Sequence, residues 1–372
     1  MCLGGDSMLD NALKLLKEFT KRSYKAYIVG GFVRDSLLGI ESNDIDITTN
    51  AKPKEIKEIF QDCCLPNEDY GSVVVVKWGV HFEITTFRQD IDYIDNRRPS
   101  EVKYIDELYP DILRRDFIIN TLCMDEDGNI IDFLGGQEDV RHHLIRTVGC
   151  AKNKFEEDAL RILRAIRFAT ILDFTLADDV CCAIKETKHL VKNLSYQRKR
   201  EELDKIFNSP YRDKGIQLLL DFHLGEELEL HHLDQVIGMD VNSVLAIWSF
   251  LQADHYPFTK NELEMIHNIQ EAMNLNNLDP MALYSYGLYV NSCAGRMKGL
   301  ELRDINESYN ALPIKSWRDI DIDSEKIMKI LNRKPGKYIK EIYSNIEREI
   351  LYKRLNNQYD EIKEYIINHY GG

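Results

Sequence analysis

Near its start the chain contains the run Tyr27-Ile28-Val29-Gly30-Gly31-Phe32-Val33-Arg34-Asp35 and, shortly afterwards, Asp44-Ile45-Asp46-Ile47. Alternate residues of a strand point to the same face. We therefore expect Asp44 and Asp46 to face one point, with Ile45 and Ile47 buried behind them. Two carboxylates in one place repel each other unless cations lie between them, and Mg²⁺ with substrate phosphates suits such a site. This pattern predicts metal-dependent phosphoryl or nucleotidyl transfer.

A glycine pair precedes the start of a predicted helix. Glycine lets the backbone approach a phosphate closely, and the N-terminus of a helix attracts anions. Three residues after Gly31, Arg34 adds a guanidinium fork that matches a phosphate. Alone, Gly30-Gly31 could be a plain tight turn, and Asp-x-Asp is often a solvated turn or a helix cap. Their combination favours a site for a nucleoside triphosphate.

A third carboxylate lies on a predicted strand. The sequences Ser72–Lys77 and His81–Phe87 read as paired strands around Trp78-Gly79. On the second strand Glu83 faces the same side as His81 and Thr85. Glu83 is therefore a candidate for a catalytic carboxylate near the metals, and the alternative is an ordinary exposed strand residue.

A mixed-charge motif follows at Leu113-Arg114-Arg115-Asp116-Phe117-Ile118-Ile119-Asn120. We predict that it spans about two helical turns, so that Asp116 and Asn120, four residues apart, meet on one face. Together they could hold a ribose or the edge of a base. A surface cluster of salt bridges is the alternative.

The segment 155–168 is predicted as one helix. Its arginines recur at every third residue, which rotates each about 60° from the last. Counted from Asp158, the side chains of Arg161, Arg164 and Arg167 are then spread over half of the helix circumference. Asp158 and Arg161 offer an acceptor and several donors for reading a base, and Arg164 and Arg167 could bind phosphates. An ordinary amphipathic helix is the alternative.

Composition limits the class of protein. The 372 residues are 44% hydrophobic, so the chain can bury more than one core. The net charge of −14 argues against a general DNA-binding protein but not against a nucleic-acid substrate. No apolar run is long enough for a transmembrane helix. The eight cysteines form no Cys-x-x-Cys pair, and the first residues lack the pattern of a secretory signal, so we expect reduced thiols in a cytoplasmic protein.

The pattern of apolar residues changes at about residue 150. Before it, short strands alternate with helices, and residues 121–133 read as a hairpin around Asp125–Asn129. After it, helical periodicity continues to the end of the chain. We therefore predict an α+β fold, with a mixed β-sheet in the head followed by an all-helical remainder.

In this order the motifs resemble those of the class II tRNA nucleotidyltransferase and bacterial poly(A) polymerase superfamily. The resemblance covers residues 26–207 and rests on five motifs, listed here in chain order: Gly30-Gly31-x-x-Arg34-Asp35, Asp44-x-Asp46, Arg114-Arg115-Asp116-Phe117 with Asn120, Glu157-Asp158-x-x-Arg161, and Arg198 to Leu203. It implies a nucleotidyltransferase head at 1–145, a helical neck for base recognition at 146–207, a helical body at 208–315 and a tRNA-binding tail at 316–372.

The resemblance also implies roles for single residues. Asp44 and Asp46 would bind two Mg²⁺ ions. Gly31, with its neighbour Gly30, and Arg34 would contact the incoming triphosphate. Arg115, Asp116 and Asn120 would hold the sugar and phosphates. Asp158 and Arg161 would read the Watson–Crick edges of CTP and ATP, supported by Arg164 and Arg167.

The partners implied are the 3′ end of tRNA, CTP and ATP, without a membrane or DNA. Within the superfamily the chain is most similar to bacterial CCA-adding enzymes, on three grounds. The motif Arg88-x-Asp90-x-x-Tyr93-x-Asp95-x-Arg97-Arg98-Pro99 resembles the flexible loop that members need to add the terminal A, the Glu157-Asp158-x-x-Arg161 motif is complete, and the tail after Pro335 is similar in kind. An A-adding or poly(A)-adding enzyme is the alternative. The neck motif departs from the usual pattern at Gln197-Arg198-Lys199, which concerns the packing of the neck.

Overall fold

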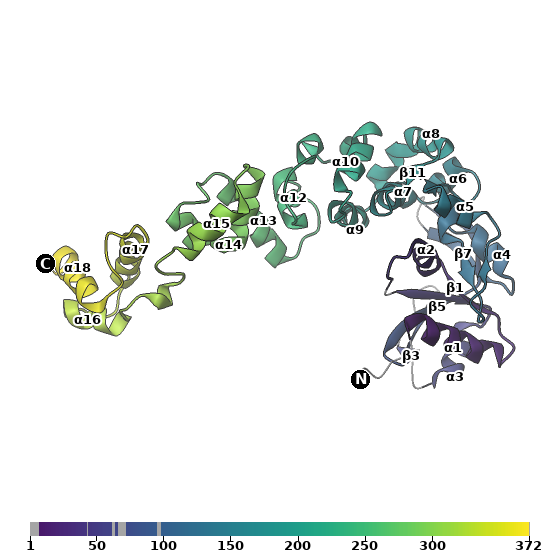
Figure 1. Cartoon of the computed structure of the whole chain (residues 1–372), viewed down its shortest axis with the longest axis horizontal. Coiled ribbons are helices and arrows are strands. Elements are labelled where there is room, and N and C mark those ends of the chain that lie inside the picture. Colours follow the sequence, from purple (N-terminus) through teal and green to yellow (C-terminus); the bar gives the residue numbers. More distant parts are fainter. Residues whose placement is uncertain (1–6, 43, 62–63, 66–71, 95–97, 372) are drawn as a thin grey trace. The chain divides into compact units, whose positions relative to one another are not determined.

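The computed structural model describes residues 7–42, 44–61, 64–65, 72–94 and 98–371. The chain divides into two compact units, Met1–Leu230 and His231–Gly372, each described by itself (Figure 1). No helix among the described residues is long and apolar enough to cross a lipid bilayer.

The first unit contains a mixed seven-stranded sheet with the strand order β3-β4-β5-β2-β1-β8-β9. Its strands are β1 (Ala26–Val29), β2 (Ile45–Thr49), β3 (Cys64–Leu65), β4 (Ser72–Lys77), β5 (Val80–Thr86), β8 (Cys123–Met124) and β9 (Ile130–Ile131). Strands β2 and β5 are parallel, and the other neighbours are antiparallel. The predicted strand pair at 72–87 and the hairpin at 121–133 are confirmed.

Helices cover both faces of this sheet. The helices of this part are α1 (Met8–Thr20), α2 (Gly31–Leu38), α3 (Pro53–Ile59), α4 (Leu108–Leu113), the 3₁₀ turn η2 (Ile118–Asn120) and α5 (Gly136–Arg141). Helix α2 lies on one face, and α1 and α3 lie on the other (Figure 1). Ser7 caps α1 through a capping box, and Pro53 occupies the first turn of α3, where its missing N–H costs nothing.

A separate antiparallel pair leaves the sheet after Phe87. It consists of β6 (Arg88–Ile94) and β7 (Arg98–Tyr104), which we call the arm, and Arg88 pairs with Tyr104 at its base. The arm occupies the segment that resembles the flexible loop of the superfamily. Asp95 and Arg97 of that motif lie outside the described residues.

The rest of the first unit is helical apart from one short parallel pair. Its helices are α6 (Ala151–Glu157), α7 (Leu160–Ile171), α8 (Asp178–Thr187), η3 (Lys188–Asn193), α9 (Tyr196–Phe207), α10 (Arg212–Asp221) and α11 (Leu224–Leu228). The pair consists of β10 (Leu144–Ile145) and β11 (Thr175–Leu176). Helix α7 packs against α9 and α10. The predicted change from mixed to helical structure is confirmed.

Every described element of the second unit is a helix. These are η4 (Leu233–Val236), α12 (Val244–Leu251), α13 (Lys260–Met273), α14 (Pro280–Met297), α15 (Leu302–Asn310), η5 (Trp317–Asp319), α16 (Ser324–Leu331), α17 (Tyr338–Leu351) and α18 (Tyr359–Tyr370). Ile342, Ile346 and Ile350 recur at helical spacing on α17 and are buried in the core with Ile362 and Ile366 of α18. The α+β fold is thus confirmed, whereas the predicted division at residues 145, 207 and 315 stays a prediction.

Candidate active site

Neighbouring strands bring the predicted acidic residues together. The parallel register of β2 and β5 sets Asp46 opposite Glu83, and the antiparallel register of β1 and β2 sets Val29 opposite Asp46. Ile45 and Ile47 are buried, whereas Asp44, Asp46 and Glu83 are exposed. The predicted alternation is confirmed, with one difference: Asp44 lies immediately before β2, which begins at Ile45.

The charge at this edge is not balanced. The surrounding protein partly dehydrates the Asp46 carboxylate, although its side chain stays accessible to solvent, and this raises its pKa above the ordinary value. The negative charges of Glu83 and Asp44 raise that pKa further, and Arg115 lowers it. Among the described residues no three His, Cys, Asp or Glu side chains are grouped to hold a metal. The edge therefore offers crowded carboxylate oxygens that need other ligands to complete a cation site.

The glycine turn brings two arginines close to these carboxylates. Gly30 precedes α2 with a φ of +81°, a value that favours glycine, and its N–H donates to the Leu122 carbonyl. A Cβ atom at Gly30 would lie 3.7 Å from Nη1 of Arg115, and one at Gly31 would lie 3.6 Å from Nη2 of Arg34. The Nε of Arg115 is buried and has no hydrogen-bond partner among the described residues. Nε of Arg115 is thus an unused donor beside the turn, whereas the nitrogens of Arg34 are engaged by Asp35 and Asn120.

A chain of buried polar contacts extends from this turn to α7. Arg34 donates from Nη1 to Oδ1 of Asn120 (2.7 Å), and Asn120 donates from Nδ2 to Oδ1 of Asp116 (3.2 Å). Arg164 of α7 donates from Nε to Oδ2 of Asp116 (2.7 Å). Burial alone would raise the pKa of Asp116, but Arg164, Asn120 and the Phe117 N–H outweigh it and lower that pKa to about 2. Asp116 is therefore a carboxylate that holds the Arg164 guanidinium and the Asn120 amide in place.

The backbone around Asp116 differs from the prediction. The two helical turns expected at 113–120 are wrong, because α4 ends at Leu113 and only the 3₁₀ turn Ile118–Asn120 follows. Asp116 accepts the N–H of Phe117 on its own side chain, which competes with helical hydrogen bonding. The predicted contact between Asp116 and Asn120 nevertheless forms.

The prediction of one helix over 155–168 is also wrong. Helix α6 ends at Glu157, Asp158 is extended (φ −148°, ψ 107°), and α7 begins at Leu160. The Asp158 carboxylate accepts the N–H of Leu160, so it turns the chain between the two helices. Asp158 thus lies at a helix junction, where its side chain is half-buried.

The side chains of the Glu157-Asp158-x-x-Arg161 motif have separate partners. Nη2 of Arg198 on α9 lies 3.2 Å and 2.9 Å from the two carboxylate oxygens of Asp158. Arg161 donates from Nη1 to the Lys154 carbonyl (2.8 Å) and to Glu157 (2.5 Å). Nη1 of Arg198 is buried without a hydrogen-bond partner among the described residues. From the sequence, Arg198 is expected only in the packing of the neck, whereas in the structure it contacts Asp158, the predicted base-reading residue.

The remaining arginines of α7 surround one aromatic ring. The guanidinium carbons of Arg34, Arg164 and Arg167 lie 5.2, 5.4 and 4.2 Å from the centre of the Phe168 ring. Nε of Arg167 lies 2.7 Å from Oε2 of Glu202 on α9, and burial lowers the pKa of Arg167 to about 10. Arg167 is therefore already engaged with α9.

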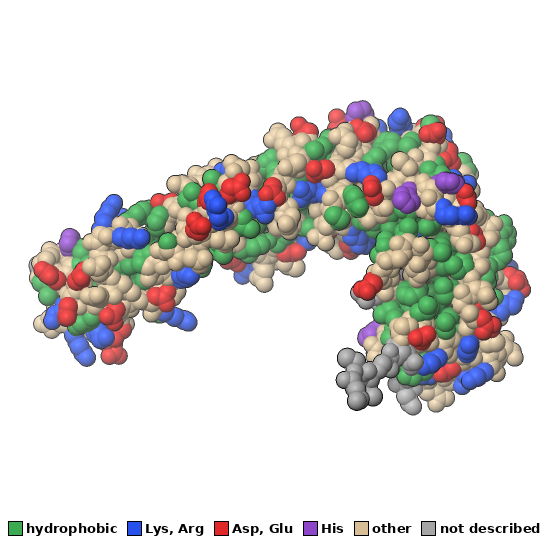
Figure 2. All heavy atoms as spheres, in the orientation of Figure 1, with side chains coloured by type: hydrophobic (Ala, Val, Ile, Leu, Met, Phe, Trp, Pro, Cys, Tyr) green, Lys and Arg blue, Asp and Glu red, His purple; other side chains and the backbone are tan. Residues whose placement is uncertain are grey.

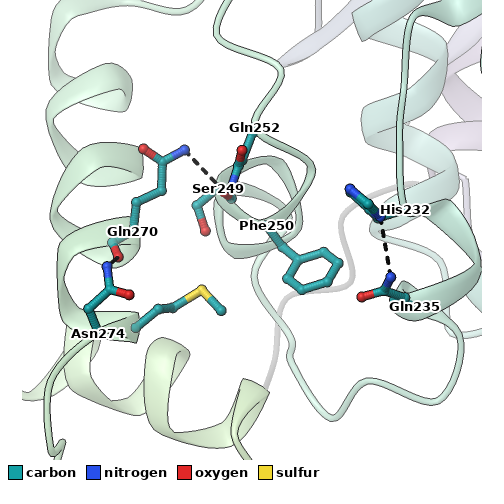
Figure 3. A pocket seen from close by; sticks show the side chains of 8 residues that line it. His232, Gln235, Ser249, Phe250, Gln252, Gln270 and Asn274 are labelled. Carbon is teal, nitrogen blue, oxygen red and sulfur yellow. Dashed lines mark hydrogen bonds between the residues drawn. The ribbon is translucent and has the colours of Figure 1, made fainter.

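A pocket of about 290 Å³ lies elsewhere, in the second unit (Figure 3). Side chains of α12, α13 and the segment around η4 line it, among them His232, Phe250 and Gln270. Gln270 donates to the Ser249 carbonyl (3.1 Å), and Nε2 of Gln235 lies 3.2 Å from Nδ1 of His232. None of the residues singled out by sequence analysis lines this pocket. We therefore place the candidate active site on the first unit.

Comparison with known proteins shows the family to which the chain belongs. Three family models match: a poly(A) polymerase head domain at residues 26–146, a probable RNA- and SrmB-binding site of polymerase A at 173–233, and a putative domain 2 of tRNA nucleotidyltransferases at 236–366.

Relatives match almost the whole chain. A CCA-adding enzyme of Bacillus subtilis is 33% identical over 95% of this chain and 97% of its own. One of Lactobacillus johnsonii is 36% identical over 96% and 97%. The crystal structure of the Bacillus stearothermophilus CCA-adding enzyme in complex with CTP superimposes with a TM-score of 0.86 at 27% identity, covering 98% of each chain. The chain belongs to the family of CCA-adding enzymes, which are nucleotidyltransferases.

Proposed function

We propose that this protein adds C, C and A in turn to the 3′ end of tRNA, using CTP and ATP without a nucleic-acid template and releasing pyrophosphate. One observation carries the proposal. The crowded carboxylates of Asp44, Asp46 and Glu83 lie beside a glycine turn whose two arginines, Arg34 and Arg115, are half-buried or buried. Acidic oxygens next to phosphate-binding donors are the arrangement that metal-dependent nucleotidyl transfer requires.

The carboxylates fit a hard divalent cation. Mg²⁺ binds oxygen ligands and is commonly held by one or two carboxylates together with substrate phosphates. Burial raises the pKa of Asp46, and the negative charges of Glu83 and Asp44 raise it further. A bound cation would relieve this repulsion. Asp44 and Asp46 would hold Mg²⁺, and Glu83 supplies a third negative charge beside them. When bound, Mg²⁺ supplies charge compensation for the leaving pyrophosphate and acidifies the attacking 3′-hydroxyl.

The protein's own residues bind and orient the nucleotide. Gly30 and Gly31 let the triphosphate approach the backbone at the start of α2, and Arg34 and Arg115 donate to its oxygens. The unpartnered Nε of Arg115 is a donor that the protein leaves unused. Asn120, itself held by Asp116, orients Arg34, and both residues would offer oxygens to the sugar hydroxyls.

The junction between α6 and α7 would read the base. Asp158 accepts and Arg161 donates, a pair that can match the Watson–Crick edges of cytosine and adenine but not those of uracil and guanine. Arg164 and Arg167 support this junction through Asp116 and Glu202. Arg198 must share or release Asp158 when the base binds, because it already donates to both oxygens.

The tail would bind tRNA. Six exposed cations lie between residues 326 and 340, namely Lys326, Lys329, Arg333, Lys334, Lys337 and Lys340, and no Asp or Glu interrupts this segment. Figure 2 shows Lys and Arg side chains around α16 and α17, with Asp and Glu among them. A basic segment in a chain of net charge −14 concentrates the attraction to phosphates in one place. This supports the predicted tail at 316–372 as the tRNA-binding part.

We also infer that the protein acts in the cytoplasm. The described cysteines at positions 123, 150, 181, 182 and 293 are free thiols, which is usual in a reducing compartment.

The test uses tRNA that ends at the discriminator base. With CTP alone we expect two C residues to be added, with ATP alone no efficient addition, and with both nucleotides a complete CCA. Addition of A alone to tRNA that already carries CC would identify an A-adding enzyme, and long A tails would identify a poly(A)-adding one. Failure to release pyrophosphate from any RNA in the presence of Mg²⁺ would contradict the proposal.

A further inference from the structure

Asp111 is a charged residue with no exposed side-chain surface at the junction of three elements. It lies on α4 and accepts four hydrogen bonds. The donors are the backbone N–H of Arg88 (3.1 Å), Oγ1 of Thr48 (3.3 Å), Nε of Arg114 (2.8 Å) and Nη2 of Arg115 (3.3 Å). A buried carboxylate is stable only when such partners compensate its lost hydration.

Each of three donors belongs to a different part of the candidate site. Thr48 lies on β2, the strand that carries Asp46. Arg88 is the first residue of β6 and therefore forms the base of the arm. Arg115 extends toward the glycine turn, where its Nη1 lies 3.7 Å from the position that a Cβ of Gly30 would occupy. One side chain thus connects the metal-binding strand, the arm and a phosphate-binding arginine.

The two carboxylate oxygens of Asp111 accept hydrogen bonds from different donors. Oδ1 accepts the N–H of Arg88 and Nε of Arg114, whereas Oδ2 accepts Oγ1 of Thr48 and Nη2 of Arg115. With Nη2 held, the Arg115 guanidinium keeps Nη1 toward the turn and its Nε without a partner. Since a guanidinium binds phosphate through a planar fork, fixing one nitrogen sets the direction of the others.

We propose that Asp111 is a positioning residue that ties both the base of the arm and the Arg115 guanidinium to the strand carrying Asp46. It acts through these partners and does not touch substrate. The inference rests on the proposed function, because the arm resembles the loop that family members need to add the terminal A. Loss of the Oδ1 contacts then affects A addition, and loss of the Oδ2 contacts affects both nucleotides.

Two substitutions separate the two oxygens. In Asp111→Asn the amide oxygen still accepts from the Arg88 N–H and from Arg114. The NH₂ group replaces Oδ2 and, as a donor, cannot accept a hydrogen bond from Arg115. In Asp111→Ala both sets of contacts are lost. Asp139→Asn and Asp139→Ala are matched controls, because Asp139 on α5 is also buried and accepts from Nε of an arginine, Arg146 (2.8 Å), that has no role in the proposed site.

The kinetic measurement compares CTP addition to tRNA lacking CCA with ATP addition to tRNA ending in CC. For Asp111→Asn we expect kcat/KM to fall about tenfold for both nucleotides, mainly through KM, since a displaced phosphate donor weakens binding. For Asp111→Ala we expect kcat/KM for ATP addition to fall about a hundredfold and kcat/KM for CTP addition to fall much less. A displacement of about 1 Å in a catalytic segment can cost this much in rate. The Asp139 variants should leave the ratio of the two steps unchanged.

Hydrogen exchange of the Arg88 amide in the full-length protein without substrate gives a readout that does not depend on activity. We expect slow exchange in the wild type and in Asp111→Asn, and exchange at least tenfold faster in Asp111→Ala. Two results would overturn the inference. One is an unchanged KM for the nucleotides in Asp111→Asn. The other is the same ratio of ATP to CTP addition in Asp111→Ala as in Asp139→Ala. A wild type that adds no CCA while its Arg88 amide is protected would instead refute the proposed function.

Discussion

At the scale of single residues, the acidic edge of β2 and β5 is the part of the molecule most dependent on something it binds. Asp46 has like charges on both sides, Glu83 across the strands and Asp44 along the chain, and Arg115 opposes them. Crowding of this kind costs stability, so these side chains do not contribute to the stability of the fold through their charges, which agrees with the proposed role in catalysis. Their removal should therefore leave the fold intact.

We expect Asp44→Ala or Asp46→Ala to lower nucleotide incorporation by about a thousandfold, because metal assistance is worth several kcal/mol and each 1.4 kcal/mol is a factor of ten. Binding of tRNA, measured by filter retention, should stay within twofold of the wild type. The substitution Asp127→Ala in the exposed β8–β9 turn serves as control. Parallel loss of tRNA binding would remove the metal assignment.

Asp116 has the opposite character, because its charge is compensated. Its pKa is lowered to about 2, so its stabilising effect is complete above the unfolded value near 3.8 and is lost as the pH falls through about 2. We expect Asp116→Asn to reduce the free energy of unfolding by about 2 kcal/mol at pH 6. In urea titrations this difference from the wild type should shrink toward zero between pH 4 and pH 2. A difference that persists at pH 2 would show that the charge is not its source.

At the scale of elements, the break between α6 and α7 determines the direction of the Asp158 carboxylate, which we propose reads the base. A continuous helix would have placed Asp158 and Arg161 one turn apart on the same surface. The extended backbone at Asp158 instead turns its carboxylate toward Arg198 on α9. If Asp158 reads the base as we propose, nucleotide selectivity depends on the three helices α6, α7 and α9.

For Asp158→Ala we predict a loss of discrimination, with UTP and GTP incorporated at rates within about tenfold of CTP and ATP, because one hydrogen-bonded base contact is worth about 1–3 kcal/mol. The KM for the nucleotide should change less, since the phosphate donors are untouched. Arg198→Gln should shift selectivity in the same direction. Competition between labelled nucleotides measures both, and unchanged rejection of UTP and GTP would remove Asp158 from base recognition.

Periodicity predicted most elements and failed where aspartates bind their own backbone. The strand at Ala26–Val29, the pair β4–β5 and the buried Ile45 and Ile47 followed from apolar spacing. Both helix errors occur where a carboxylate takes a nearby N–H, at Asp116 and at Asp158. Propensity and period do not register such local competition with the helix.

Contacts between residues far apart in the sequence could not be predicted from periodicity or motif spacing either. The Asp111 carboxylate meets Thr48 across 63 positions and Arg88 across 23, and Arg198 meets Asp158 across 40. The sequence around Asp111 does not distinguish it from an ordinary polar residue. Motif spacing predicted the candidate ligands. The residues that orient them could be identified only from their contacts in the folded structure.

At the scale of the whole molecule, charge is distributed unevenly. The chain is acidic overall, yet the exposed cations of residues 326–340 follow one another without an intervening acid. An acidic surface repels nucleic acid in general, so a local basic segment can bind tRNA while the rest of the protein discourages non-specific association.

Replacing Lys334 and Lys337 by Gln should weaken tRNA binding and reduce the slope of log K against log salt by about 1 to 2, because each phosphate contact releases close to one counterion. Incorporation at saturating tRNA should be unchanged. Lys54→Gln with Lys57→Gln, two exposed lysines on α3, is the matched control. An unaltered salt slope in the tail variant would place the tRNA contact elsewhere.

The contacts from Arg34 through Asn120 and Asp116 to Arg164 have a consequence for engineering. They begin on α2 and end on α7, so they cross the predicted boundary at residue 145. A chimera that joins the first 145 residues of one relative to the remainder of another would take the residue at Asp116 from one parent and the residue at Arg164 from the other. Such grafts should work only when donor and recipient share all four side chains, which makes this quartet a criterion for choosing parents in recombination libraries.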